Sequence, residues 1–409
     1  MTEQMNEPKL RFGEFKAPLK TVPLDKLTTK VSDGIHSTPK YDDSGEFFFV
    51  NGNNLKNGSI QLDKKTKRVS SEEAKKHHKQ IGEHTILMSI NGTIGNIAFY
   101  QYEPIMLGKS ASYINIDPRT ADKFFISNYL QREATKYYFD TAVTGSTIKN
   151  LSLKAIKNTP ISSPTLPEQQ KIASFLSKVD EKIGLLSEKK AKLTEYKRGV
   201  MQQLFNGKWQ ASAAHGNNQD EQLTFIPPTL RFKADDGSEF PDWEEKRYSD
   251  IFTAFKSGQG ITASNIKELG EYPVYGGNGL RGYTNQYTHD GFYFLIGRQG
   301  ALCGNINRVT GKSYISEHAI ACKVDSDLGT EFYAQRLEQI NLNRFSESSA
   351  QPGLSVNKLL RFKMLAPCVS EQAKIASFLL RLDEKVSITN SELEKAKEWK
   401  RGLLQQMFV

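Results

Sequence analysis

Several short loops rich in glycine and asparagine carry side chains with more than one hydrogen-bonding group. In the first half of the 409-residue chain these loops are GIHSTPK, VNGNNLKNG, INGTIGN and GKSASY, and in the second half GGNGLRGY, GRQG and SEHA. Arg, Lys, Asn, Gln, Ser and Thr read the edges of bases, and backbone amides of glycine turns hold phosphates. The candidate DNA contacts are His36, Ser37, Lys40, Asn51, Asn53, Asn54, Asn91, Thr93, Lys109, Asn278, Arg281, Tyr283, Arg298, Gln299 and His318.

The charge of the chain agrees with such a partner. Lys and Arg number 55 against 46 Asp and Glu, which leaves a formal charge of +9. A basic excess favours polyanions, because each neutralised phosphate releases condensed counterions. For each loop residue taken alone, an ordinary role in a turn is the alternative interpretation.

The chain resembles known catalytic motifs only weakly. The Gly-x-Gly-x-x-Gly at residues 277–282 is followed by a strand-like stretch instead of a helix, so it indicates a turn or a DNA-facing loop and not a cofactor loop. The PDWEEK stretch at residues 241–246 places its carboxylates too close together for a nuclease metal site. His77 and His78 have no carboxylate or cysteine at a ligand spacing, and the three cysteines show no C-x-x-C pair. We therefore expect no catalytic residues, no metal and no cofactor in this chain.

One stretch of sequence occurs twice in the chain. EQQKIASFLSKVDEKI begins at Glu168, and EQAKIASFLLRLDEKV begins 203 positions later at Glu371. A looser repeat, PKLRF and PTLRF, lies upstream at an offset of 220, from Pro8 to Pro228. A repeated unit of about two hundred residues is the size of a domain plus a helix. The predicted parts are a first globular domain, a first long helix, a linker, a second globular domain and a second long helix, over residues 1–165, 166–206, 207–228, 229–368 and 369–409.

Both repeated helices carry apolar residues at alternating spacings of four and three. A seam of this period sustained for five heptads is typical of a coiled coil. If a twofold axis relates the two units, the helices must run antiparallel. The predicted seam comprises Ile172, Leu176, Val179, Ile183, Leu193, Val200, Ile375, Leu379, Leu382, Val386, Leu393 and Leu403.

The globular segments contain short β-rich runs such as EFFFV and GFYFLIG between Gly- and Asn-rich turns. This pattern predicts α+β domains. The chain shows no apolar run near eighteen residues and no signal-peptide pattern, so we expect a cytoplasmic protein without a membrane partner. The predicted fold class is α+β: two globular domains separated by a long antiparallel two-helix coiled coil, with internal pseudo-twofold symmetry.

The doubled helix, together with YPVYGGNGLRGY and GRQGALCGNI, resembles the specificity subunit of type I restriction-modification enzymes. The resemblance implies two target recognition domains, each reading half of a split, asymmetric site in double-stranded DNA. It implies two modification subunits docked on the coiled coil and up to two restriction subunits joined to them. The methyl donor S-adenosylmethionine, ATP and Mg would then belong to those partner subunits, and this chain would be non-catalytic.

Two other functions remain open from the residues alone. A DNA methyltransferase or nuclease with duplicated domains would need its own catalytic motifs, which were not found. A coiled-coil scaffold unconnected with DNA would leave the basic excess and the Arg- and Asn-bearing loops unexplained.

Overall fold

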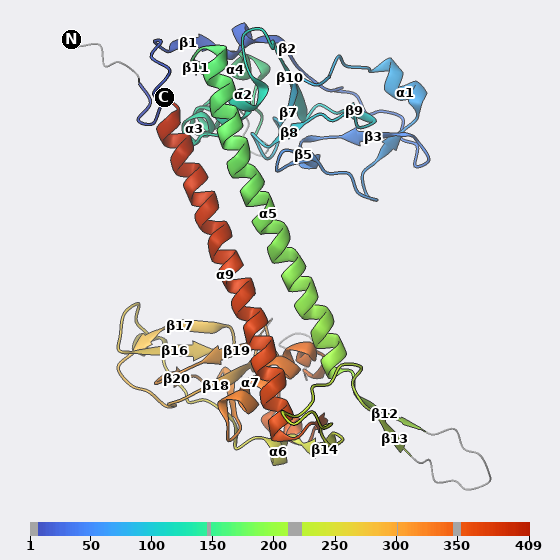
Figure 1. Ribbon diagram of the computed structural model, residues 1–409, viewed down its shortest axis with the longest axis vertical. Helices are drawn as coiled ribbons and strands as arrows, with labels where there is room; N and C mark the ends of the chain where they lie inside the picture. The colour runs from blue at the N-terminus through green and yellow to red at the C-terminus, as the bar shows by residue number, and fades with distance from the viewer. Residues whose placement is uncertain (1–6, 145–148, 212–222, 301, 347–352) are drawn as a thin grey trace. The chain divides into compact units, whose positions relative to one another are not determined.

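The computed structural model describes residues 7–144, 149–211, 223–300, 302–346 and 353–409 (Figure 1). The chain divides into two compact units. Unit 1 comprises residues 1–187 and 391–409, and unit 2 comprises residues 188–390. Each unit therefore contains one α+β domain, the beginning of one long helix and the end of the other.

A four-stranded antiparallel sheet lies at the centre of unit 1, in the order β2-β10-β7-β8. Its strands are β2 (Thr28–Asp33), β10 (Ala111–Ile116), β7 (Thr85–Ser89) and β8 (Ile97–Phe99). Successive side chains of a strand face opposite sides of a sheet. Ile86 and Met88 join the larger core, whereas Leu87 joins a smaller one on the other face. Three short helices contribute to the larger core, together with the two long helices: α2 (Lys123–Leu130), α3 (Glu133–Ala142) and α4 (Leu153–Lys157).

The remaining strands of unit 1 form smaller sheets. The three-stranded sheet β6-β3-β9 contains a parallel pair between β3 and β9. The β4 and β5 strands pair with each other, as do β1 and β11. These elements are β1 (Lys20–Pro23), β3 (Phe47–Val50), β4 (Leu55–Lys56), β5 (Ser59–Ile60), β6 (Arg68–Val69), α1 (Ser71–Lys76), β9 (Ile105–Leu107) and β11 (Pro160–Ser163).

Unit 2 repeats the central sheet in the order β15-β21-β18-β19. The strands are β15 (Ala254–Ser257), β21 (Ala319–Lys323), β18 (Tyr293–Gly297) and β19 (Ile306–Val309). A second sheet, β17-β16-β20, again contains a parallel pair, between β16 and β20. The other elements of unit 2, including the strands of this second sheet, are β14 (Glu244–Arg247), α6 (Tyr248–Ile251), β16 (Tyr272–Gly276), β17 (Gly279–Thr284), β20 (Tyr314–Ile315), α7 (Asp327–Gln339), α8 (Val356–Leu359) and β22 (Lys363–Ala366).

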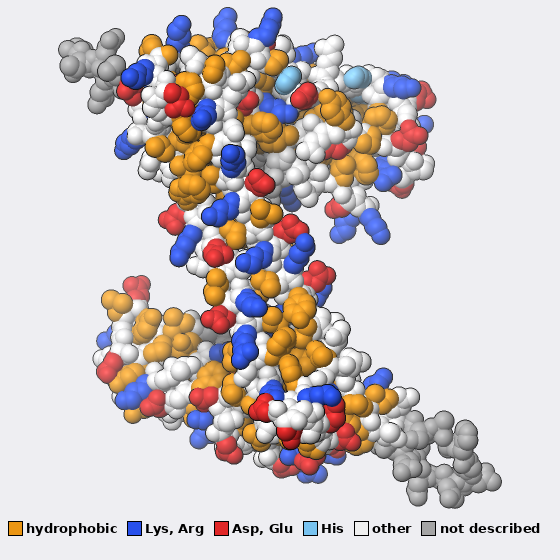
Figure 2. Space-filling model, in the orientation of Figure 1, with side chains coloured by type: hydrophobic (Ala, Val, Ile, Leu, Met, Phe, Trp, Pro, Cys, Tyr) orange, Lys and Arg blue, Asp and Glu red, His pale blue; other side chains and the backbone are white. Residues whose placement is uncertain are grey.

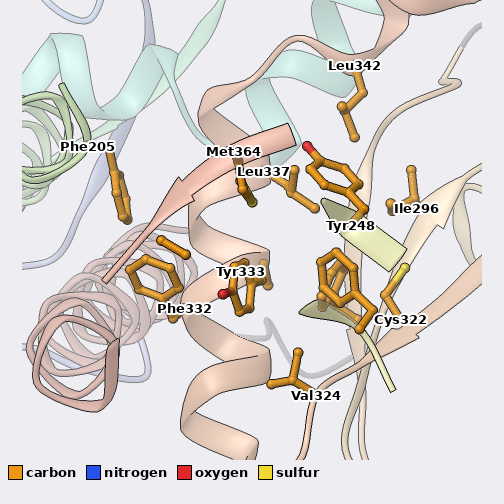
Figure 3. Packing of buried hydrophobic residues seen from close by; sticks show 14 of the residues in the cluster. Phe205, Tyr248, Ile296, Cys322, Val324, Phe332, Tyr333, Leu337, Leu342 and Met364 are labelled. Carbon is orange, nitrogen blue, oxygen red and sulfur yellow. The ribbon is translucent and has the colours of Figure 1, made fainter. Parts of the chain in front are cut away.

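The core of unit 2 is rich in aromatic rings (Figure 3). Tyr248 and Phe332 are buried in it, and Phe205 at the end of the first long helix packs edge-on against Phe332. The helix end is thereby fixed to the domain of unit 2 by apolar burial.

The two repeated helices are α5 (Leu166–Phe205) and α9 (Val369–Met407). In unit 1 the beginning of α5, with Ile172 and Leu176, shares a core with Leu403 and Met407 at the end of α9. Unit 2 has the reverse arrangement, in which Val200 shares a core with residues at the beginning of α9. The helices therefore pack antiparallel within each unit, and the α+β fold with internally repeated units agrees with the sequence-based expectation.

The seam is closed by paired polar residues where it is not apolar. Lys197 forms an ion pair with Asp383 in unit 2, and Lys400 forms the equivalent pair with Asp180 in unit 1, at 2.6 Å. The twelve predicted seam residues are buried except for three that are half-buried, namely Ile183, Leu193 and Val386.

The predicted linker over residues 207–228 contains two paired strands. These are β12 (Lys208–Ala211) and β13 (Leu223–Ile226), which pair antiparallel. Residues 212–222 between them lie outside the described part of the chain. No helix among the described residues combines the length and the apolar content needed to cross a membrane.

Candidate nucleic-acid interface

In unit 1 the ends of several strands surround a hollow of about 670 Å³. The β2 and β7 strands are both antiparallel to β10, so their carboxyl ends lie together with the beginning of β10. This margin of strand ends is the edge at which the hollow lies. Four of the predicted contacts line the hollow from four different loops: His36, Asn51, Asn91 and Lys109. Residues that are far apart in sequence therefore share one surface.

Hydrogen bonds fix some of these side chains and leave others available. The Asn51 side-chain oxygen accepts a bond from the Ser110 hydroxyl at 2.8 Å, and the same hydroxyl accepts one from the Gly52 amide at 2.9 Å. His36 Nε2 lies 2.8 Å from Asp33 Oδ2, although most of the His36 side chain is exposed. Asn51 is thus a positioning residue for the loop, whereas His36 can still reach a ligand.

The other predicted contacts of unit 1 do not line the hollow. Asn54 is engaged in its own turn, where its side chain accepts from the Asn51 amide at 3.0 Å and donates to the Gln61 carbonyl at 3.1 Å. The remaining four are exposed on neighbouring loops: Ser37, Lys40, Asn53 and Thr93.

Unit 2 brings Arg298, Gln299 and His318 together at the equivalent edge. His318 Nδ1 lies 2.9 Å from Gln299 Oε1, and Arg298 Nη1 donates to the Glu317 carbonyl at 3.4 Å. The turn between β16 and β17 abuts them, because a Cβ added at Gly277 would lie 2.7 Å from the His318 carbonyl. Two of these side chains therefore hold each other's orientation.

The three other predicted contacts of unit 2 lie at different places along the β16–β17 hairpin. Asn278 lies in its turn, beside the edge just described, and Arg281 follows on β17. Arg281 leans over Gly276, where an added Cβ would lie 2.6 Å from Arg281 Cδ. Tyr283 lies toward the other end of β17, where its backbone pairs with Lys267. The structure does not bring Tyr283 to the edge that carries Arg298.

The same backbone hydrogen bonds build both edges. In unit 1 the Ile90 amide donates to the Ser110 carbonyl at 3.0 Å, and in unit 2 the Arg298 amide donates to the His318 carbonyl at 2.9 Å. Arg298 lies 208 positions after Ile90, and His318 lies 208 positions after Ser110. Ile90 therefore has Arg298 as its counterpart, and Ser110 has His318. The shared backbone hydrogen bonds form a common frame, on which the two units present different side chains.

A close approach of two strands in this frame requires glycine. A Cβ added at Gly34 would lie 2.1 Å from the Leu107 carbonyl oxygen, and one at Gly258 would lie 2.1 Å from the Ile315 carbonyl oxygen. Contacts this short are sterically forbidden, so each loop after β2 and β15 has glycine at this point.

The frame also shows a residue that the sequence did not single out. Lys109 precedes Ser110, and Glu317 precedes His318, so the two units carry opposite charges at equivalent places. The sequence feature that relates Glu317 to Lys109 is the alignment of SEHAI with GKSAS. The two stretches share a single alanine, so the strand pairing is needed to align them.

The weak catalytic motifs have structural explanations. The Gly-x-Gly-x-x-Gly stretch is the β16–β17 hairpin, with Gly279 at φ 93°, which confirms the turn interpretation. In PDWEEK, Trp243 is buried and donates to Glu371, while Glu245 forms an ion pair with Lys363. Within the described ranges, no three His, Cys, Asp or Glu side chains gather as metal ligands would.

Comparison with known proteins identifies the family. A family model described as the type I restriction modification DNA specificity domain matches residues 20–195 and 241–398. The EcoprrI specificity subunit of a type I restriction enzyme, from Escherichia coli, is 43% identical over 143 residues, which are 34% of this chain and 35% of that protein. The match thus spans about a third of that relative.

Longer matches are more distant. The type I restriction enzyme MjaVIII specificity subunit from Methanocaldococcus jannaschii is 21% identical over 80% of this chain and 79% of its own length. The crystal structure of a type I restriction-modification S subunit from M. genitalium superposes with a TM-score of 0.64 at 19% identity, covering 98% of this chain and 99% of the other. The fold is therefore shared over the whole length. Since the family model covers most of both repeats, the chain belongs to the family of type I restriction-modification DNA specificity subunits.

Proposed function

We propose that this chain reads a bipartite, asymmetric DNA site, with one domain bound to each half-site, and carries the modification subunits of its complex. Methyl transfer and any ATP-driven restriction belong to the partner subunits, which supply S-adenosylmethionine, ATP and Mg. The chain itself contributes recognition and assembly and performs no catalytic step.

The repeated frame is the observation that carries this proposal. Both units hold loops at the same sheet edge with the same backbone bonds, yet the side chains presented there differ. A structural scaffold without a reading role would have no need for different polar groups on a frame that both units share. Different Arg, Lys, Asn and His groups at equivalent positions suit two unlike half-sites.

The assembly role is supported by apolar side chains exposed at equivalent positions of the two long helices. Tyr196 of α5 and Trp399 of α9 are 203 positions apart and are 56% and 49% exposed. Leu185 and Ile388 are a second such pair. Figure 2 shows hydrophobic side chains at the surface of these helices among the charged ones. Repeated apolar groups fit two copies of one partner, and we propose that these are the modification subunits.

The test is selection of DNA from a randomised library by the chain co-expressed with its modification subunit. The expected result is an enriched sequence with two unlike specified segments separated by unspecified positions, and adenine methylation within both segments. Enrichment of no sequence would refute the proposal. Methylation by the chain alone, with S-adenosylmethionine but without a partner, would favour the alternative of a duplicated-domain methyltransferase.

A further inference from the structure

We propose that Glu317 determines specificity in unit 2 by accepting a hydrogen bond from the amino group of a cytosine in the major groove. This inference rests on the proposed function. It assigns a role to an acidic side chain at an edge where a DNA-binding surface would ordinarily be basic.

The position of Glu317 places it among the readers. It lies between Ser316 and His318 in the loop before β21, and its counterpart Lys109 lines the hollow of unit 1. Its amide donates to the Gln259 carbonyl at 3.1 Å, and its carbonyl accepts from Arg298. The backbone of Glu317 is therefore held on both sides, which fixes where its side chain begins.

The carboxylate is oriented but incompletely bonded. Glu317 Oε1 lies 3.3 Å from His318 Nε2, while Oε2 is covered by protein and accepts no hydrogen bond from any described residue. A covered acceptor without a donor is rare in folded proteins. The Glu317 side chain as a whole is nevertheless 37% exposed, so a donor on a bound ligand can reach the carboxylate, whose last side-chain bond rotates easily.

The charge of Glu317 selects the kind of donor. A carboxylate is repelled by phosphates, so a place near the DNA backbone is unfavourable for it. In the major groove cytosine offers the N4 amino group as a donor, and Glu pairs with it. Adenine offers N6 beside the acceptor N7, which repels the second carboxylate oxygen. Guanine and thymine present only acceptors at this edge, so Glu317 excludes them.

The neighbouring cation complements this assignment. Arg298 reaches the backbone of Glu317, and an Arg can bind O6 and N7 of the guanine that pairs with the cytosine. One base pair would then be read from both strands. In unit 1, Lys109 at the equivalent place is a donor instead, so the same position of the frame favours guanine there.

Library selection with the complete complex tests the assignment. We expect Glu317→Gln to reduce the preference for cytosine at one position of the unit 2 half-site by about 10-fold to 100-fold. Glu317→Lys, which installs the residue type of unit 1, should change the preferred base there to guanine. The unit 1 half-site should be unchanged in both variants, which shows that the complex is folded.

Glu268→Gln is the matched control, because Glu268 is an exposed acid of the same domain outside this edge. It should leave both half-sites unchanged. The inference is overturned if Glu317→Gln selects the same sequence as the parent chain, or weakens binding equally for all sequences. Failure of the parent chain to select any sequence is a different result, because it refutes the proposed function itself.

Discussion

Arg11 and Glu168 are joined by two parallel hydrogen bonds, from Nε to Oε1 at 2.7 Å and from Nη2 to Oε2 at 2.8 Å. Arg231 and Glu371 repeat this pair in unit 2, at 3.1 and 2.8 Å. Each Arg belongs to the LRF segment before a domain, and each Glu to the first turn of a long helix. The two sequence repeats, with offsets of 220 and 203, thus meet in one contact.

Breaking one of these pairs should destabilise the protein strongly. The Glu371 side chain is completely buried and also accepts from Trp243 Nε1 at 3.2 Å. Arg231→Ala leaves this charge without its main partner, which costs about 3–5 kcal/mol. Urea unfolding measures the loss. The control is Lys192→Ala, which removes an exposed helix pair with Glu188 and should have a much smaller effect. Equal losses would contradict the assignment.

The seam pairs permit a test of the internal symmetry. Double-mutant cycles for Lys197–Asp383 and Lys400–Asp180 should give coupling energies that agree with each other, each about 1 kcal/mol or less, since the carboxylates are half-exposed. Asp383→Ala alone should cost more than Asp180→Ala, because Gln335 also donates to Asp383 at 2.8 Å. Coupling in only one cycle would show that the two units are not energetically equivalent.

Arg298→Ala should relax recognition in the unit 2 half-site only. The loss for the cognate sequence is expected to be about 1–3 kcal/mol, with little change on random DNA. Arg361→Ala removes an exposed cation from the same domain and is the control. Binding titrations on cognate and scrambled duplexes make the measurement. An equal loss on both duplexes would assign Arg298 to phosphate.

A fragment of residues 1–213 should form a homodimer. It lacks Leu403, Met407 and Phe408, which belong to the core of unit 1. Their counterparts at the same offset are Val200 and residues 204–205 of α5, so a second copy of the fragment can supply them. Leaving each such side chain exposed costs about 1.5–3 kcal/mol.

The mass of this fragment in solution and the sites methylated with its modification subunit are the measurements. An isologous dimer should select two inverted copies of one half-site. A monomer, or a dimer that methylates the parent asymmetric site, would contradict the prediction.

The thiols should differ in reactivity. Burial raises the pKa of Cys322 well above its usual value and also raises the pKa of Cys303. Since the thiolate is the reactive form, both should resist labelling in the folded protein, whereas the half-buried Cys368 should react first. Mass spectrometry after timed alkylation checks this order. Rapid labelling of Cys322 at pH 8 without urea would contradict it.

The long helices could be predicted from sequence because their signal is local and repeated. A period of 3.5 residues identifies the seam, and the offset of 203 relates the two copies. The ion pair between Lys197 and Asp383 could not be predicted in this way, because it depends on the register between two distant segments.

The candidate interface was predictable in part. Glycine and asparagine loops indicated His36, Asn91 and Lys109, which do share one hollow. The convergence of those loops depends on strand order, which no local pattern encodes. Asn54 has the residue type of a reader but is used by its own turn. The sequence did not indicate Glu317, because its equivalence with Lys109 depends on the strand pairing.

The presence of α9 residues in the core of unit 1 has a consequence for synthesis of the chain. The domain that leaves the ribosome first shares its core with Leu403 and Met407, and Tyr129 donates to the Val409 carbonyl at 3.0 Å. Its apolar surface near Ile172 therefore stays uncovered until the end of α9 has been made. Synthesis proceeds at about 5–20 residues per second. During that interval the nascent unit is open to pairing with a neighbouring chain on the same messenger.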